Sequence, residues 1–155
     1  MRLISATIIA IGMCFAATGA SAAYFSSSQL AKVQAIKVEV TAAVEDGCLD
    51  YPDALKTETE LILRQSGIKV VEDDSGHTLD INVVSYAITG GCSAHVSLQT
   101  YVFETLTDGT SGLVEASNQG TLISGPKGGF PQQLRAQVNA KVSKLANEIL
   151  KARQK

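Results

Sequence analysis

The sequence has no tryptophan, only 5% aromatic residues and only three prolines in 155 residues. It also has no collagen-like period, no sustained heptad pattern and no repeated block, which argues against fibrous and solenoid proteins. Because 45% of the residues are hydrophobic and the net charge is only −2, a disordered chain is disfavoured too. The length suits one compact domain and is too short for two.

Positive charge is also scarce, with 13 lysines and arginines against 15 acidic residues. Nucleic-acid binding requires a clustered cationic face that neutralises phosphates. The sequence therefore predicts a protein that does not bind nucleic acid.

The motifs of common catalytic and metal sites are absent. There is no Cys-x-x-Cys, no His-x-x-x-His and no Gly-x-Ser-x-Gly, and the glycines and lysine of residues 125–131 do not have phosphate-loop spacing. The two histidines, His77 and His95, have no recognisable acidic partner motif. We therefore predict no catalytic residue, no metal site and no cofactor.

The first 22 residues have the pattern of a signal peptide. Residues 1–2 supply a positive end, residues 3–17 form a mostly apolar stretch, and residues 20–22 read Ala-Ser-Ala. The apolar stretch is shorter than the ~20 residues that cross a membrane, so we expect cleavage after Ala22 rather than an uncleaved anchor. No later segment is long and apolar enough to span a membrane. The sequence predicts export to the periplasm or, alternatively, to the medium.

The cysteine count agrees with export. Removal of the signal peptide takes away Cys14 and leaves Cys48 and Cys92, which in an oxidising compartment can form one disulfide. Such a bridge would close a loop of about 44 residues and stabilise the domain by roughly 3–4 kcal/mol. The alternatives are a redox pair, a metal site or two unpaired thiols.

Hydrophobic periodicity predicts one α+β domain over residues 35–155, after a flexible leader of residues 23–34. Apolar residues alternate from Ile36 to Val44, as in a strand with one buried face. A helix is expected from Asp50 to a cap at Gly67, with Ala54, Leu55, Leu61 and Ile62 on one side. A second helix follows Pro131. Further strands are expected over 68–71, from 79 to a reversal at 90–91, over 94–106, and over 113–123 at a sheet edge or with a bulge.

This order, β-α-β-β-β-β-α, predicts two layers, with both helices on one face of a mixed, mostly antiparallel sheet of about five strands. We expect the helices to cover the face that carries Val38, Ile81, Val96 and Leu98. The opposite face then carries Lys37, Glu39, Asp80, Asn82, His95, Gln99, Tyr101 and Phe103.

Some of these residues are candidates for contact with a partner protein. Exposed aromatic residues on a rigid sheet are efficient contact groups, so Tyr101, Phe103 and the neighbouring His95 are candidates, with a simple solvated face as the alternative. In the glycine-rich loop of residues 125–131, Phe130 and Lys127 are further candidates, with a plain connecting loop as the alternative.

The stretch LILRQSGIKVV at residues 61–71, followed by LDINVVSY at residues 79–86, resembles the TolB amino-terminal-like envelope domains. The resemblance covers roughly residues 36–105. It implies a role in envelope assembly, export or trans-envelope bridging through protein binding rather than chemistry.

These observations predict an exported, non-enzymatic protein-binding or assembly accessory module of the bacterial envelope. Its partner would be another envelope or secreted protein. One alternative is a small exported hydrolase that acts on envelope polymer or peptide with a site assembled around His95. The other is an inhibitor that blocks a hydrolase with one loop. The sequence leaves the ligand, the strand order and the oligomeric state open.

Overall fold

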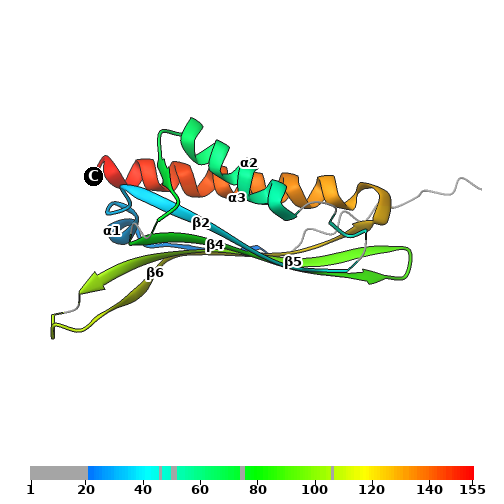
Figure 1. The fold of residues 1–155 in the computed structure, drawn as a ribbon, viewed down its shortest axis with the longest axis horizontal. Helices are drawn as coiled ribbons and strands as arrows, with labels where there is room; N and C mark the ends of the chain where they lie inside the picture. The colour runs from blue at the N-terminus through cyan, green and yellow to red at the C-terminus, as the bar shows by residue number, and fades with distance from the viewer. Residues whose placement is uncertain (1–20, 46, 50–51, 74–75, 106) are drawn as a thin grey trace, which may run out of the picture.

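The computed structural model describes residues 21–45, 47–49, 52–73, 76–105 and 107–155. They form a sheet with the helices α2 and α3 lying along one face (Figure 1). The elements are β1 (Ser21–Phe25), α1 (Ser27–Leu30), β2 (Ala35–Val44), α2 (Pro52–Gln65), β3 (Lys69–Val71), β4 (His77–Ile88), β5 (Gly91–Thr105), β6 (Ser111–Pro126), the short 3-10 helix η1 (Lys127–Gly129) and α3 (Phe130–Arg153).

The six strands lie in the order β1-β6-β5-β4-β2-β3. Strand β2 runs parallel to both β3 and β4, and the other pairs are antiparallel. Helix α2 makes the crossover between β2 and β3, and Gly67 supplies the positive φ, 78°, at its end. The predicted α+β class and the mixed, mostly antiparallel sheet are confirmed.

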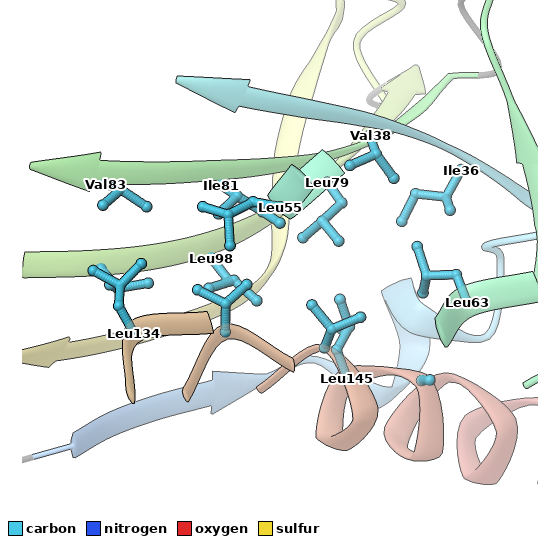
Figure 2. Packing of buried hydrophobic residues seen from close by; sticks show 14 of the residues in the cluster. Ile36, Val38, Leu55, Leu63, Leu79, Ile81, Val83, Leu98, Leu134 and Leu145 are labelled. Carbon is cyan, nitrogen blue, oxygen red and sulfur yellow. The ribbon is translucent and has the colours of Figure 1, made fainter. Parts of the chain in front are cut away.

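The core lies between this sheet and the two long helices (Figure 2). Leu55 and Leu63 of α2 and Leu134 and Leu145 of α3 are fully buried. They meet buried aliphatic residues of three strands, namely Ile36, Val38, Leu79, Ile81, Val83 and Leu98. The prediction for α2 was wrong at Leu61, which is exposed, because the buried stripe runs through Leu55, Thr59 and Leu63.

Residues 23–34 are not a flexible leader. Residues 21–25 form β1, which pairs with residues 117–121 of β6, and both Leu30 and Val33 are buried. The guanidinium of Arg153 donates to the carbonyl oxygen of Val33, with Nε 3.1 Å away. A five-residue strand has too few positions for a clear period, and tertiary pairing fixes it in place. Residues 1–20 of the predicted signal peptide lie outside the described residues.

Strand β6 is not the last strand of the sheet, because β1 pairs with its residues 117–121, although that register leaves both ends of β6 without β1 beside them. The predicted bulge is present. Thr100 pairs with Ser117 and Tyr101 pairs with Glu115, so Ala116 is the extra residue. Beyond this point the β5–β6 hairpin bends away from the helix layer (Figure 1). A bulge increases local twist and bends the strands, which accounts for this curvature.

Cys48 and Cys92 form a disulfide, as predicted, with their Cα atoms 5.7 Å apart. Both residues are fully buried, and the bond ties the loop after β2 to the start of β5. Close by, the backbone N–H of Ala87 donates to the Glu45 carboxylate at 2.6 Å. Stable structural disulfides form in oxidising compartments, so the bond indicates a location outside the cytoplasm.

None of the helices in the described ranges has both the length and the hydrophobicity needed to cross a membrane.

Removing the disulfide is expected to destabilise the domain strongly. The double substitution Cys48→Ser and Cys92→Ser opens a loop with a sequence separation of 44, which should lower the free energy of unfolding by roughly 3–4 kcal/mol. Urea denaturation of the variant and the oxidised protein measures this loss. An unchanged midpoint would show that the bond contributes nothing to stability.

Gly91→Ala is a second test of the packing. A Cβ atom on Gly91 would clash with the carbonyl oxygen of Gly125 on β6, so we expect a loss of about 2 kcal/mol or more in thermal or urea denaturation. Gly128→Ala is the matched control, because a Cβ there meets nothing within 4 Å and should change stability by less than about 0.5 kcal/mol. Equal stability of the two variants would contradict the close strand approach.

Candidate functional site on the open sheet face

The sheet face turned away from α2 and α3, here called the open face, carries most of the exposed apolar side chains. Among the described residues, eight large apolar side chains are exposed, and seven of them lie on this face by strand alternation and register. They are Tyr24, Val84, Tyr86, Ile88, Phe103, Leu113 and Leu122. The eighth, Leu61, lies on α2. Such a concentration of exposed apolar residues marks a candidate interaction surface.

The open face contains a groove of about 750 Å³ where the β5–β6 hairpin bends away from the helices. One side is apolar and consists of Tyr101, Phe103 and Leu113. The side formed by β2, β4 and the turn before β4 is more polar and consists of Lys37, Glu39, Gly76, Thr78 and Asp80. This volume falls in the range of roughly 300–1,000 Å³ that is common for ligand sites.

Strand register explains why these residues meet. Lys37, Thr78, Tyr101 and Glu115 occupy matching positions on four neighbouring strands. One row further on, Glu39 lies beside Asp80. At the other end of the groove, the backbone N–H of Phe103 donates to the carbonyl oxygen of Gly76 at 2.7 Å, which closes the turn before β4 against β5.

The groove carries an excess of negative charge. The Lys37 ammonium pairs with the Glu39 carboxylate at 2.8 Å. None of the ion pairs between described residues includes Asp80. Burial raises the pKa of the Asp80 carboxyl above its ordinary value, and the Glu39 carboxylate raises it further. Burial also raises the pKa of the Tyr101 hydroxyl, with further increases from the carboxylates of Glu115 and Asp80.

A second, shallower hollow of about 340 Å³ lies beyond β6 on the same side of the sheet. Its lining residues are Ala23, Tyr24, Glu115 and Asn118. Glu115 therefore lies in this hollow and also acts electrostatically on Tyr101 in the groove. The two hollows therefore lie on either side of Glu115 on the same face of the sheet.

The predicted contact residues are only partly brought together. Tyr101 and Phe103 line the groove, and Phe103 is exposed. His95 is exposed on the same face but lies six residues away along β5, roughly 20 Å, between Val84 and Leu122 of the adjacent strands. No hydrogen bond or ion pair between described residues involves His95.

The loop candidates lie elsewhere. Phe130 was a candidate contact residue, but it is fully buried, because it begins α3 and packs into the core. Lys127 is exposed, and its side chain lies over Gly47 beside the disulfide. Within the described ranges, no group of three or more histidine, cysteine or acidic residues is placed to hold a metal ion.

Sequence reasoning missed the apolar character of the open face. It predicted a mostly polar face with two aromatic residues. In the second half of β4, however, the apolar side chains of Val84, Tyr86 and Ile88 are exposed on this face. A signal was available, because Val83 and Val84 are consecutive and therefore point to opposite faces. From that point onward, both faces of β4 carry apolar residues.

The raised pKa of Asp80 predicts a pH-dependent effect on stability. A carboxyl with a raised pKa in the folded state favours folding when protonated, and this advantage is lost as the pH rises through that pKa. Asp80→Asn should therefore increase the urea midpoint at neutral pH. The difference should disappear below the ordinary Asp pKa of 3.8.

Asp108→Asn is a control of opposite sign. Hydrogen bonds from the side chain and backbone of Thr110 lower the pKa of Asp108, so its charge favours folding at neutral pH. This substitution should lower the midpoint at neutral pH. A lower midpoint for Asp80→Asn as well would contradict an unfavourable environment for the Asp80 charge.

No protein-family model, TolB-like or other, matches the chain, and no curated protein sequence matches it. Among solved structures, a substituted variant of PelC from Paraburkholderia phytofirmans, a dodecamer, has a TM-score of 0.55 and 11% identity over 83% of this chain and 98% of its own. A second PelC dodecamer from the same organism has a TM-score of 0.51 and 10% identity, and the match covers 84% of this chain and 96% of the PelC chain. A minor lipoprotein from Acinetobacter baumannii has a TM-score of 0.39 and 10% identity, over 76% and 92%, and supports no conclusion. The chain is therefore similar to PelC in fold.

Proposed function

We propose that this chain is an exported, non-enzymatic assembly module of the bacterial envelope that binds another protein through the open face of its sheet. The observation that carries this proposal is the position of the exposed apolar side chains. Seven of the eight in the described part of the chain lie on the sheet face that α2 and α3 do not cover. Exposed apolar clusters of this kind are typical of interaction sites.

The arrangement of the face also suits protein binding. Aromatic residues, which are enriched at interface contacts, occur at Tyr24, Tyr86 and Phe103. They lie on paired strands of one sheet, so little conformational freedom of the backbone is lost when a partner binds. A rigid surface with exposed aromatic groups favours binding of a partner protein whose surface is complementary in shape.

Two further observations support an envelope location and a role in assembly. The buried disulfide between Cys48 and Cys92 supports an extracytoplasmic location, which we take to be the periplasm. The similar PelC structures are dodecamers, so a domain of this fold is able to assemble with copies of itself. We therefore include a second copy of this chain among the protein partners that the test must detect.

A crosslinking experiment tests the proposal. Benzoylphenylalanine, a photoactivated crosslinker, replaces Leu122 on the open face, and the protein is expressed in intact bacteria. We expect ultraviolet light to produce a discrete adduct with a partner protein or a second copy, identified by mass spectrometry. The adduct should be lost when Val84→Glu is added, because Val84 is exposed on the same face, two strands away from Leu122, and a charge there would be buried at the interface.

The matched control places the same crosslinker at Leu61 on α2. Leu61 is 53% exposed and Leu122 is 54% exposed, so the two positions differ in layer and not in accessibility. Position 61 should give no discrete adduct. Equal labelling from both positions, or none from position 122 in a folded and exported protein, would overturn the proposed function.

A further inference from the structure

We propose that the groove that spans β2 to β6 binds a lysine or arginine side chain of the partner protein. This inference rests on the proposed function and specifies the chemistry of the partner at one part of the open face. It follows from the shape of the groove and from the charges on its two sides. No chemical step is involved.

Charge complementarity is the first argument. The carboxylates of Glu39, Asp80 and Glu115 lie in or beside the groove, and Lys37 is the cation among its lining residues. Lys37 already pairs with Glu39, which leaves Asp80 and Glu115 in excess. A ligand cation would therefore enter a region with a net negative charge.

The position of Asp80 strengthens this argument. Its carboxylate is partly removed from water and lies near the Glu39 carboxylate, and both effects disfavour its charge. A cation within about 4 Å would favour that charge again, because an opposite charge offsets both desolvation and repulsion. The binding of an ammonium or guanidinium group would thus relieve an unfavourable feature of the free protein.

The apolar side of the groove fits the rest of a basic side chain. Phe103 and Leu113 are exposed and paired across β5 and β6, and Tyr101 lies next to them on β5. The methylene stem of lysine or arginine packs well against such surfaces while its charged end stays in a polar environment. The ring faces of Tyr101 and Phe103 also attract cations. One side chain can therefore use both sides of the groove.

A titration with defined peptides tests the inference on the full exported domain with its disulfide intact. The probe is a short, end-blocked peptide of alternating alanine and lysine, followed by shifts of the backbone amide resonances in nuclear magnetic resonance. The matched peptides contain norleucine, which keeps the stem without the charge, or glutamate. We expect saturable shifts centred on Thr78, Tyr101 and Leu113 with the lysine peptide, and weaker binding of both other peptides.

Two variants locate the binding groups. Asp80→Asn should weaken binding of the lysine peptide by about fivefold or more, as expected for loss of one partly buried ion pair. Asp53→Asn, the same substitution at an exposed residue of α2, should leave binding of the lysine peptide unchanged. Leu113→Ser should weaken binding of the lysine peptide, because it removes an apolar contact with the methylene stem of lysine. Leu61→Ser on α2 should leave this binding unchanged. Raising the salt concentration from about 0.1 M to about 1 M should weaken binding in the unmodified protein.

Three results would overturn the inference. They are shifts that map away from the groove, equal binding of the lysine and norleucine peptides, and unchanged binding in Asp80→Asn. The spectrum of each variant reports directly whether it is folded. If position 122 gives protein adducts but the lysine peptide does not bind, the open face is a docking surface and only the basic-segment inference fails. If position 122 gives no adduct, the proposed function itself fails.

Discussion

The packing of α2 and α3 against one face of the sheet is the interaction on which the rest of this structure depends. Leucines from both helices meet aliphatic residues of β2, β4 and β5 in one continuous core. A sheet has two faces, and the two long helices cover one of them (Figure 1). The apolar residues of the other face, such as Leu113 and Leu122, therefore remain exposed in the described domain. Exposed apolar residues gathered on one face are typical of interaction surfaces, which is why this face is the candidate functional surface.

Local distortion hollows part of this face into a groove. The extra residue Ala116 in β6 bends the β5–β6 hairpin, and the groove forms where the bend begins. The same register places Asp80 near Glu39, where its charge is unfavourable for folding. Residues that bind ligands often reduce the stability of the free protein, and Asp80 fits that pattern.

Particular residues show where sequence reasoning succeeded and where it failed. The alternation from Ile36 to Val44 and the cap at Gly67 were predicted because both signals are local. Strand β1 was missed because its pairing with β6 depends on a segment almost a hundred residues away. Phe130 was placed in a connecting loop because glycines precede it, whereas α3 begins at Phe130 and its side chain is buried. Tyr101 and Phe103 were correctly assigned to the uncovered face, but the groove around them was not foreseen.

The sequence by itself determined the α+β class, the disulfide partners and the covered faces of β2, β4 and β5. These features follow from residue periodicity and from the presence of only two cysteines beyond the predicted signal peptide, so they need no knowledge of distant neighbours. Only the tertiary structure decided the strand order, the pairing of β1 with β6 and the position of the bulge opposite Tyr101. A groove depends on which strands lie side by side and in which register. Residues as distant as Lys37 and Leu113 become neighbours only when the sheet has formed.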